Sequence, residues 1–533
     1  MRALLVQARS PETYWSYRHA LPYVRKRAAL PPLGLATLAA LLPRAWEVRL
    51  VDLHVAELSD GELAWADVVL VSAMIVQAPS AREVVRRARA LGRRTVVGGP
   101  APTTAPGLFE EADHLFQGEA EGRLAGLVAA LEDGSRPAPR ILSPQGDARP
   151  TLQDTPVPRF DLVDLDAYAS LSLQLSRGCP FQCEFCDIIE MFGRVPRLKS
   201  AEAILAELDA LHALGARGSL FFVDDNFIGN RRVVARLLPR IREWQEAHGW
   251  PFDLYTEASL DLAQEPALLE AMVEAGFTAV FVGIESPAPE SLREAHKTQN
   301  LRLDPAEGVR ILTRAGLEVF AGFILGFDAD PPDVFERQIA FICESPIPRA
   351  MIGLLTALPG TALWRRLERE GRLRAAASGD QFERPNFETA MEDRTLLAGY
   401  RRVLAACYSD EAYYARCERH LSTVRLRPGG ALPPGWLPAL ARAMVGIGLA
   451  GRRRLRFWRL LGLGLRRGVG GFARAVTLAI LGEHMIRYTD EVVLPRLDAA
   501  LAALPEPAAV VPAVTRATPA SHPSLAPGAA APA

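Results

Sequence analysis

Two long stretches of the chain alternate short apolar runs with amphipathic helical patterns, and this alternation limits the fold more than any other feature. Such an order is typical of a parallel sheet with helices packed on its faces. Within residues 1–145 the apolar runs predict five strands, at Ala3–Val6, Glu47–Val51, Val68–Ser72, Thr95–Val97 and His114–Gln117. The helices between them begin near Leu33, Gly61, Ser80 and Ala105. We therefore expect an open α/β sheet that binds ligands at the carboxyl ends of its strands.

The second alternating block, residues 168–373, predicts six further strands. They lie at Leu171–Leu175, Ser219–Val223, Phe252–Thr256, Ala279–Ile284, Val319–Leu325 and Met351–Leu355. Amphipathic helices such as Ala201–Leu214 and Pro266–Ala275 separate these strands. Six β/α units suit a partial (β/α)6 barrel, an open relative of the eight-stranded TIM-type barrel, with its chemistry at the carboxyl ends of the strands.

The remaining segments differ from these two blocks in composition. Residues 134–160 are rich in Pro, Gly and Asp, which indicates a linker, and we assign the linker to residues 146–167. Helical patterns dominate residues 374–504 and predict a helical C-terminal domain. Residues 505–533 are a mixture of Pro, Ala, Thr and Ser with little apolar bulk, so we expect a disordered tail.

Charge and cysteine content exclude several classes of protein. The net charge of −1 over 533 residues gives no electrostatic basis for nucleic-acid binding. Six cysteines in a chain of this length do not make a disulfide framework. The first residues lack the apolar run of a signal peptide, and no charge-free apolar run is long enough to span a bilayer. We expect a cytoplasmic protein.

Three of the six cysteines, Cys179, Cys183 and Cys186, lie within eight residues in a CxxxCxxC arrangement. Iron–sulfur clusters are held by cysteine thiolates on short loops. Because three thiolates bind only three of the four irons in a [4Fe–4S] cluster, one iron stays open to an exchangeable ligand. A zinc site requires a fourth Cys or His nearby, and none occurs between Ser176 and Lys199.

This loop resembles that of the radical S-adenosylmethionine (SAM) superfamily, whose CxxxCxx[aromatic]C motif matches the three cysteines and Phe185. The resemblance implies that the amino and carboxylate groups of SAM chelate the open iron. It also implies that one electron cleaves the sulfonium of SAM into methionine and a 5′-deoxyadenosyl radical. The protein then orients the reacting groups and excludes water from the site. A flavodoxin or ferredoxin type of donor is the expected external source of electrons.

The resemblance also assigns SAM-binding roles to polar and glycine residues at the ends of later strands. These are Asp224, Asp225, Glu257, Ser259, Glu285 and Ser286, and the GxIxG residues Gly322, Ile324 and Gly326. The superfamily's glycine-rich GGE-type motif is missing, so that role passes to Asp224 or Asp225. Solvated carboxylates at strand ends are the alternative reading. Lysine is almost absent from the chain, yet Lys199 and Lys297 follow motif-bearing strands, and a functional contact and chance retention are both open for them.

Residues 1–145 resemble the Rossmann-like cobalamin-binding domain of the cobalamin-dependent radical SAM subfamily. The motifs at successive strand ends imply cobalamin contacts from Ser72, Gly98, Gly99, Gly118 and Glu119. The resemblance extends over about residues 1–400, and the pieces PPLGLATLAALLP and CDIIEMFGRVPR resemble the branch that includes the hopanoid methylases. His54 follows the second strand and lacks the glycine of the DxHxxG pattern, so we expect cobalamin with no protein histidine below the cobalt.

Other activities of similar chains are disfavoured. The first strand is not followed by GxGxxG, which argues against a dinucleotide site. Methylthiolating relatives need cysteines for an extra cluster before the radical SAM core, and this chain has no cysteine before Cys179. Cys407 and Cys417 alone cannot hold an auxiliary cluster.

The function that the resemblance implies is methylation of an unactivated carbon in a small-molecule or lipid-like substrate. One alternative is a cobalamin-assisted radical rearrangement or cyclisation. Another is a non-catalytic cobalamin sensor, which the intact cysteine triplet argues against. The arginine-rich, apolar stretch Leu437–Arg467 suits either peripheral contact with the inner membrane face or a solvated helical cap over the barrel.

Overall fold

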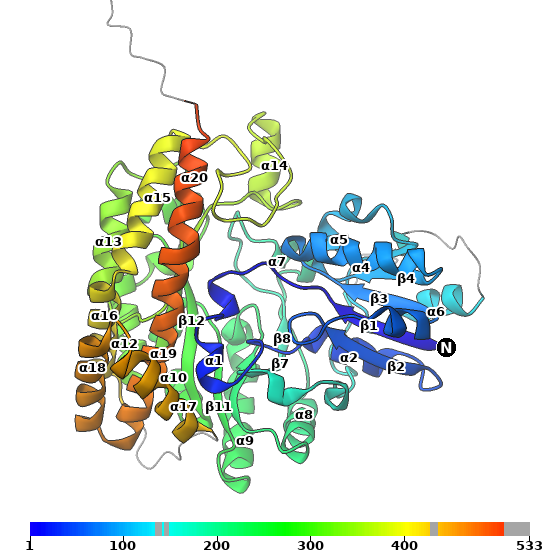
Figure 1. The fold of residues 1–533 in the computed structure, drawn as a ribbon, viewed down its shortest axis with the longest axis horizontal. Helices are drawn as coiled ribbons and strands as arrows, with labels where there is room; N and C mark the ends of the chain where they lie inside the picture. The colour runs from blue at the N-terminus through cyan, green and yellow to red at the C-terminus, as the bar shows by residue number, and fades with distance from the viewer. Residues whose placement is uncertain (134–140, 143–148, 427–434, 506–533) are drawn as a thin grey trace, which may run out of the picture.

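The computed structural model describes residues 1–133, 141–142, 149–426 and 435–505. An N-terminal α/β domain and a larger α/β barrel lie side by side, and the C-terminal helices cover the outside of the barrel (Figure 1). The predicted fold class is therefore confirmed. Residues 146–148 of the predicted linker and residues 506–533 of the predicted disordered tail lie outside the described residues.

The N-terminal sheet is parallel throughout, with strand order β2-β1-β3-β4-β5-β6. Its strands are β1 (Arg2–Gln7), β2 (Glu47–Asp52), β3 (Val68–Ser72), β4 (Arg94–Gly98), β5 (His114–Phe116) and β6 (Ile141–Leu142). All five predicted strands are present, but the expected total was wrong because β6 was missed. That strand has two residues and lies within the Pro- and Gly-rich stretch, which conceals its apolar signal.

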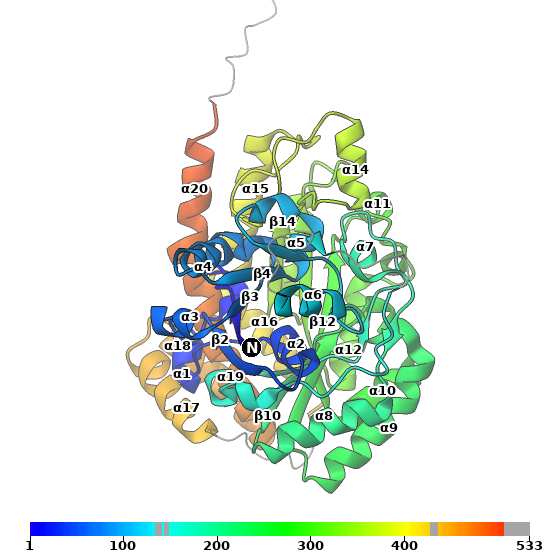
Figure 2. The same cartoon turned by 90° about the vertical axis from the view of Figure 1, so that its right-hand side faces the viewer.

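Helices cover both faces of this sheet, as parallel sheets require. They are α2 (Leu33–Leu41), α3 (Asp60–Trp65), α4 (Ala78–Ala90), α5 (Pro100–Thr104) and α6 (Ala125–Glu132). Apolar residues of α3 and α4 pack on one face, and those of α2 and α6 pack on the other. Figure 2 shows the N-terminal domain in front of the barrel.

The barrel sheet is also parallel, with strand order β14-β13-β12-β11-β10-β7. The strands are β7 (Leu171–Leu173), β10 (Gly218–Phe222), β11 (Phe252–Glu257), β12 (Phe277–Glu285), β13 (Glu318–Leu325) and β14 (Ala350–Leu354). The six predicted strands are all present, with ends that differ by up to two residues. Because β7 and β14 do not pair, the barrel is open between its first and last strands.

The helices outside the barrel strands are α8 (Ala201–Ala213), α9 (Arg231–Ala247), α10 (Pro266–Ala275), α11 (Pro289–Glu294), α12 (Pro305–Ala315) and α13 (Val334–Glu344). The bounds of α10 agree with the prediction because both ends are encoded locally. Pro266 occupies the first turn, and Gly276 ends the helix in a left-handed conformation with φ of 109°.

The inner face of the barrel carries a layer of aromatic side chains. Phe221 stacks on Tyr255 with ring centroids 4.6 Å apart, and Phe281 lies 5.3 Å from Phe320. Alternate residues on the same strands, such as Phe222 and Val280, point outward into the main hydrophobic core. The alternation places aromatic groups inside the barrel and aliphatic packing beneath the helices.

An N-terminal segment leaves the first sheet and crosses to the barrel, which the sequence did not predict. It contains a 3-10 turn (Tyr14–Ser16) and α1 (Leu21–Val24), drawn in dark blue in Figure 1. The indole of Trp15 lies 5.6 Å from the ring of Phe281 and 6.5 Å from that of Phe320. This segment therefore contributes an aromatic group to the inner face of the barrel.

The C-terminal region is helical, as predicted. Its helices are α14 (Ala362–Arg369), α15 (Asp393–Cys407), α16 (Asp410–Thr423), α17 (Trp436–Ala443), α18 (Arg454–Arg466), α19 (Gly468–Tyr488) and α20 (Leu494–Ala502). A π-helical turn, Met444–Leu449, continues α17. Gly468–Ala502 is long and apolar enough to cross a membrane, but 61% of its most apolar window is buried inside the protein, as in the core helix of a soluble domain.

Candidate active site

The cysteine loop lies between a short hairpin strand, β8 (Ser176–Arg177), and α7 (Ile188–Phe192). The amide of Cys179 donates to the carbonyl of Gly193 at 3.2 Å, which closes the loop at its base. The amide of Cys186 donates to the carbonyl of Cys183 at 3.2 Å, which forms a tight turn at its tip. The three thiols therefore come from one short and closed loop.

Two glycines permit this closure. Gly178 has φ of +99°, and a Cβ atom at that position would lie 2.8 Å from the carbonyl oxygen of Gly193. Gly193 has φ of +85°, and its Cβ would lie 3.0 Å from Nη1 of Arg149. Arg149 in turn donates to the carbonyl of Glu190 at 2.9 Å, so the predicted linker ties down the end of α7.

The three thiols of the loop lie close to one another. Burial, and then the nearby Cys183 and Cys179, raise the pKa of Cys186, so the thiols lie within electrostatic reach of one another. Within the described part of the chain, no three Cys, His, Asp or Glu side chains converge closely enough to hold one metal ion. Three thiolates on one short loop would hold a [4Fe–4S] cluster through three of its irons and leave the fourth iron open.

Two amide side chains reach the sulfurs. Nδ2 of Asn226 lies 4.0 Å from Sγ of Cys179, and Nε2 of Gln299 lies 3.8 Å from Sγ of Cys183. Sequence reasoning assigned no role to either residue. The available signal was that Asn226 ends the Asp224-Asp225-Asn226 motif and that Gln299 lies in a polar stretch unlike its surroundings.

The two aspartates after β10 support the backbone around the cysteine loop. Asp224 accepts the amide of Leu175 at 3.1 Å and the hydroxyl of Ser176 at 2.5 Å. Asp225 accepts the amide of Gly178 at 2.8 Å. Burial raises the pKa of Asp224 to about 7 and that of Asp225 to about 6. The carboxylate of Asp224 already accepts hydrogen bonds from the protein. The geometry therefore does not support the predicted direct contact between Asp224 and SAM.

Glu257, at the end of β11, has a different environment. It lies inside the barrel mouth, and no hydrogen bond or ion pair to its side chain occurs among the described residues. Burial, followed by the charges of Asp225 and Asp224, raises its pKa to about 8. Its carboxyl group is therefore protonated at neutral pH and available to a ligand.

An ion pair between Lys297 and Glu285 lies beside the cysteine loop. The Nζ–Oε1 distance is 2.5 Å, and Nζ of Lys297 is also 6.0 Å from the ring centroid of Phe185. Glu285 has φ of 65° and His296 has φ of 54°, so two non-glycine residues near the pair have a left-handed backbone. Such strain is typical of functional sites. Gly283 leaves room for the pair, because its Cβ would lie 2.6 Å from Nζ of Lys297.

The other lysine, Lys199, is buried and paired with Glu207 on α8, away from the sulfurs. Of the two lysines that the sequence singled out, Lys297 therefore lies beside the cysteine loop and Lys199 forms a buried structural pair.

Other predicted SAM residues have structural partners. The hydroxyl of Ser286 accepts the amide of Ala288 at 3.2 Å in a buried turn. The amide of Gly326, which has φ of +103°, donates to Asp330 at 2.8 Å. Gly322 leaves room for the ring of Phe281, because a Cβ at this position would lie 3.0 Å from its Cζ. Ile324 packs with Phe185 in a small apolar cluster.

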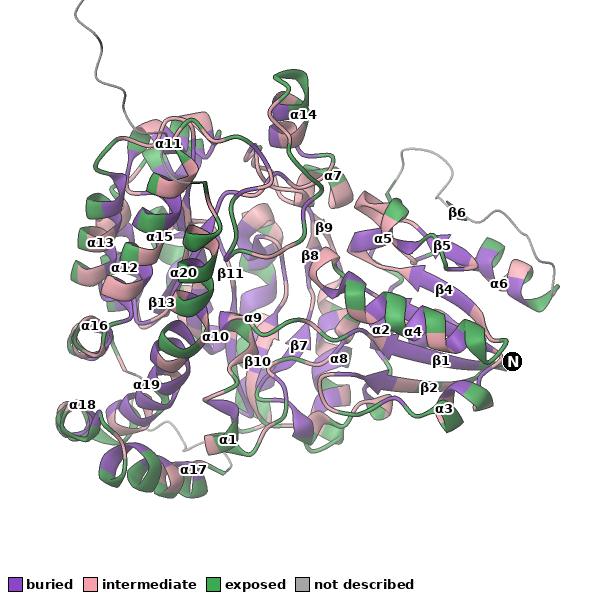
Figure 3. Ribbon diagram, turned by 45° about the horizontal axis from the view of Figure 1, so that its top comes forward, coloured by how far each residue is buried: buried purple, intermediate pink, exposed green. Residues whose placement is uncertain are grey.

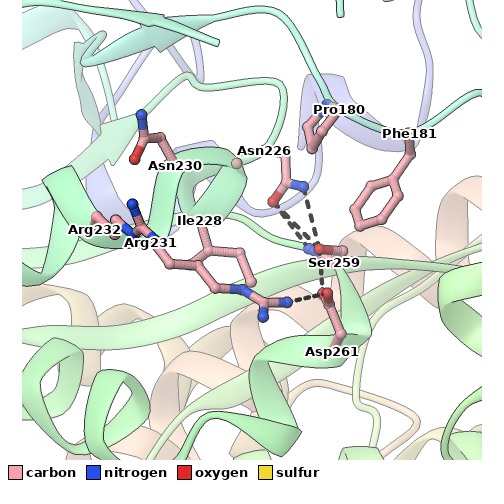
Figure 4. Close-up of a pocket in the computed structure, with 10 residues that line it drawn as sticks. Pro180, Phe181, Asn226, Ile228, Asn230, Arg231, Arg232, Ser259 and Asp261 are labelled. Atoms are coloured by element: carbon pink, nitrogen blue, oxygen red, sulfur yellow. Dashed lines mark hydrogen bonds and ion pairs between the residues drawn. The ribbon is translucent and has the colours of Figure 1, made fainter. Parts of the chain in front are cut away.

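Ser259 lines a pocket of about 300 Å³ beside the cysteine loop (Figure 4). The pocket also contains Phe181 of that loop. Nδ2 of Asn226 donates to the Ser259 hydroxyl at 3.2 Å, and that hydroxyl donates to Asp261 at 2.5 Å. A chain of hydrogen bonds thus leads from this pocket toward Cys179.

An arginine from α14 holds the outer side of the cysteine loop. Nε of Arg366 donates to Glu184 at 2.6 Å, and the same guanidinium pairs with Asp328 at 3.0 Å and Glu294 at 3.2 Å. The carbonyl of Glu184 also accepts the amide of Leu363 at 2.9 Å. The C-terminal region therefore helps to position the loop.

The N-terminal domain holds the inner side of the loop through a buried ion-pair network. Arg177 pairs with Glu121 at 2.7 Å and with Glu119 at 2.9 Å, while Arg197 pairs with Glu119 at 2.8 Å. Sequence reasoning placed Glu119 against cobalamin. The structure instead engages its carboxylate with two arginines of the β8–β9 hairpin, where β9 is Arg197–Leu198.

The carboxyl edge of the N-terminal sheet brings the other predicted cobalamin residues together. Ser72 ends β3 beside Gly99, which has φ of +99° and whose Cβ would lie 3.2 Å from the Ser72 hydroxyl. Gly98 ends β4, and the amide of Gly118 donates to the hydroxyl of Thr103 at 3.0 Å. Met74 is 47% exposed at this edge. An open edge of small residues fits a flat macrocycle lying across it.

The ring nitrogens of His54 are both engaged within the protein. Nδ1 lies 2.7 Å from Asp52, and Nε2 accepts the amide of Ser10 at 2.9 Å. This geometry agrees with the rejection of His54 as a cobalt ligand.

Comparison with known proteins identifies the family. Residues 173–342 match the radical SAM superfamily, residues 27–128 match the B12 binding domain, and residues 361–495 match a domain of unknown function, DUF4070. An uncharacterized methyltransferase of Synechocystis sp. is 42% identical, with 92% of each chain covered. The hopanoid C-2 methylase of Rhodopseudomonas palustris is 37% identical, covering 92% of this chain and 94% of the relative. The chain belongs to the cobalamin-dependent radical SAM methylase family.

Solved structures agree with this family at the level of the fold. The radical SAM methyltransferase TsrM from Kitasatospora setae, with cobalamin and a [4Fe–4S] cluster bound, has a TM-score of 0.57 at 18% identity and covers 92% of this chain and 99% of its own. The radical SAM enzyme OxsB, with aqua-cobalamin bound, has a TM-score of 0.58 at 15% identity, covering 94% and 83%. The cofactors of this radical SAM enzyme are a [4Fe–4S] cluster, SAM and cobalamin.

Proposed function

We propose that this enzyme transfers a methyl group to an unactivated carbon of an apolar small-molecule or lipid-like substrate. The observation that carries the proposal is the buried Glu119–Arg177–Glu121 network, which fixes the cysteine loop against the carboxyl edge of the cobalamin-binding domain. Methyl transfer requires the radical-generating group and the methyl donor to face one substrate carbon. The similarity to methylases along nearly the whole chain supports the same reaction.

The overall reaction balances with two SAM molecules and two electrons from an external donor of the flavodoxin or ferredoxin type. One SAM is reduced to methionine and 5′-deoxyadenosine, and the deoxyadenosine carries the hydrogen removed from the substrate carbon. The other SAM loses its methyl group, which replaces that hydrogen, and becomes S-adenosylhomocysteine. When bound, the cluster supplies the electron that cleaves SAM, and cobalamin supplies the methyl group.

The residues of the barrel mouth bind and orient rather than exchange protons with the substrate. Cys179, Cys183 and Cys186 would hold three irons. Glu257, protonated near neutral pH, is positioned to hydrogen-bond a polar group of SAM. Lys297 supplies a positive charge beside the thiolates.

The aromatic layer supports an apolar substrate. Phe281, Phe320 and Trp15 lie below the polar mouth, and Trp15 is 46% exposed although its ring contacts both phenylalanines. An exposed indole inside the barrel offers an apolar contact surface to a ligand. Radical chemistry also favours such walls, because they exclude water from the site.

We further propose that cobalamin binds with no histidine below the cobalt. The support is that both ring nitrogens of His54 already have partners. An electron paramagnetic resonance (EPR) spectrum of the cob(II)alamin form with histidine-nitrogen splitting would contradict this.

We also place the enzyme in the cytoplasm, where its thiols stay reduced. Contact with a membrane is a separate proposal, because it rests on another surface.

The decisive experiment is an anaerobic assay of the reconstituted holoenzyme with SAM, a low-potential reductant and candidate apolar substrates. Methyl transfer predicts S-adenosylhomocysteine, 5′-deoxyadenosine and methylated product together. Deoxyadenosine with an altered but unmethylated product would support cobalamin-assisted rearrangement or cyclisation instead. An intact cluster with no SAM cleavage under any reductant would support a sensor.

A further inference from the structure

The face formed by α17, the π-helical turn and α18, here called the α17–α18 face, carries large apolar side chains that are exposed in the described part of the protein. Leu455 is 80% exposed, Leu437 is 67% exposed and Leu465 is 65% exposed. Large exposed hydrophobic residues are concentrated on this face, which also contains Met444, Val445, Leu449, Trp458 and, just beyond α18, Val469. Figure 3 shows extensive exposed surface on both helices at the edge of the molecule.

Helix α18 has two apolar stripes instead of one. Its inner stripe, Phe457, Leu460, Leu461 and Gly464, is buried against the other C-terminal helices. Leu455, Trp458, Gly462 and Leu465 recur at helical spacing on the opposite side, and all are exposed. A soluble surface helix normally has one apolar face, so the outer stripe marks a surface for an apolar partner.

Arginines flank the outer stripe, and negative charge is missing from the whole segment. The sequence from Arg419 to Gly482 contains no Asp or Glu. Arg452, Arg454 and Arg466 are exposed, and no ion pair to them occurs in the described ranges. Arg459 extends to Glu418 at 2.8 Å and Arg467 to the carbonyl of Val424, so some arginines of the segment have other partners.

We propose that the α17–α18 face docks the enzyme on an anionic lipid bilayer, with the leucines in the interface and the arginines against the headgroups. An apolar stripe flanked by arginines is the pattern of helices that lie in the membrane interface. The unpaired Arg452, Arg454 and Arg466 complement the negative surface of such a bilayer. A second copy of this chain would meet the same unpaired arginines and be repelled by them.

The position of the face is compatible with catalysis at a membrane. Arg442 of α17 donates to the carbonyl of Tyr23 at 2.6 Å, and Arg474 of α19 pairs with Glu318 at the start of β13. The face therefore lies toward the amino ends of the barrel strands, whereas the cysteine loop lies at their carboxyl ends. Figure 1 shows α17 and α18 low in the view and α7 above them, near the middle of the molecule. Docking leaves the cluster end free for a soluble electron donor.

Vesicle flotation of the full-length holoenzyme tests the proposal. We expect binding to vesicles of equal parts phosphatidylglycerol and phosphatidylcholine, and little binding to pure phosphatidylcholine. The double variant Leu455→Ser with Leu465→Ser should bind at least about 10-fold more weakly, because two inserted side chains are lost. Replacing Arg452, Arg454 and Arg466 by Gln should cost roughly fivefold for each charge at low salt.

Matched controls are Leu214→Ser, which removes a half-exposed leucine on another surface, and the exposed pair Arg44→Gln with Arg302→Gln. Both should float like the wild type. The proposal fails if the wild type does not float, if pure phosphatidylcholine binds equally well, or if the leucine variant floats normally. It also fails if light scattering shows that the variant dissociates a dimer while vesicle binding is absent.

The proposal does not depend on methyl transfer. Formation of 5′-deoxyadenosine without vesicles should be unchanged in the leucine variant, since neither residue contacts the barrel mouth. A loss of flotation with normal SAM cleavage supports docking alone, whereas failed methylation by a protein that floats counts only against the proposed reaction.

Discussion

Arg177, at the base of the cysteine loop, pairs at 2.7 Å with Glu121 of the cobalamin-binding domain, and both side chains are largely buried. Burial alone would raise the pKa of Glu121, but the hydrogen bond and charge of Arg177 lower it. The contact joins the two halves of the site without belonging to either cofactor's own ligands. We therefore expect it to control how well SAM cleavage and methyl transfer are coupled.

Glu121→Gln should keep the shape of this contact but leave Arg177 with less compensating charge. Glu119 still pairs with that arginine, so we expect the free energy of unfolding to fall by about 1.5–3 kcal/mol. The ratio of 5′-deoxyadenosine to methylated product should rise, because the domains move relative to each other. Thermal melting and product quantification check both effects. Glu83→Gln, which removes an exposed pair with Arg86 in the same domain, should change neither.

Replacing Gln299 by Leu should lower the reduction potential of the cluster. Its Nε2 lies 3.8 Å from Sγ of Cys183, and hydrogen bonds to cluster sulfurs stabilise the more negative reduced state. Cleavage of SAM should slow by roughly 10-fold, as for other residues that orient metal ligands. An EPR-monitored redox titration measures the shift. Gln264→Leu, on an exposed turn, is the control, and an unchanged potential in Gln299→Leu would remove this role.

Trp15→Ala should weaken the use of an apolar substrate without unfolding the enzyme. The indole is 46% exposed beside Phe281 and Phe320, and an aromatic contact with a substrate is worth about 0.5–1.5 kcal/mol, so losing it should lower kcat/KM by up to roughly 10-fold. Because Trp15 is half exposed, the melting temperature should change little. Trp65→Ala, on α3 of the cobalamin-binding domain, should leave kcat/KM unchanged. A large fall in melting temperature for Trp15→Ala would indicate a structural role instead.

The sequence predicted the strands well because each is a short apolar run with local turn signals. The cysteine loop was equally local, since its three sulfurs lie within eight residues. Contacts between distant segments carried no such signal. Glu119 looked like a cofactor contact from its position at a strand end, but its partners, Arg177 and Arg197, are more than fifty residues away. Trp15 gave no periodic pattern, and only the fold brings it into the barrel.

Glu318 should make stability depend on pH in the acid range. Burial would raise its pKa, but Arg349 at 2.8 Å and Arg474 at 3.0 Å lower it to about 2. A depressed pKa stabilises the folded state above the unfolded value of about 4.5, and that contribution disappears as pH falls toward 2. Glu318→Gln should therefore cost about 3 kcal/mol near pH 7, and less as the pH is lowered. Urea unfolding at several pH values tests this, with Glu307→Gln, which removes a half-exposed pair with Arg310, as control.

Gly178→Ala should prevent assembly of the cluster although no ligand is changed. The alanine Cβ would lie 2.8 Å from the carbonyl of Gly193 and 3.3 Å from that of Phe192, at φ of +99°. The base of the loop must then open, which displaces Cys179 from the other thiols. We expect iron and sulfide content after anaerobic reconstitution to fall well below one cluster per chain. Gly215→Ala, also at positive φ (+79°) but with no atom within 4 Å, should cost only about 1 kcal/mol and bind a full cluster. A full cluster in Gly178→Ala would mean that the loop tolerates an open base and that its closure does not position the cysteines.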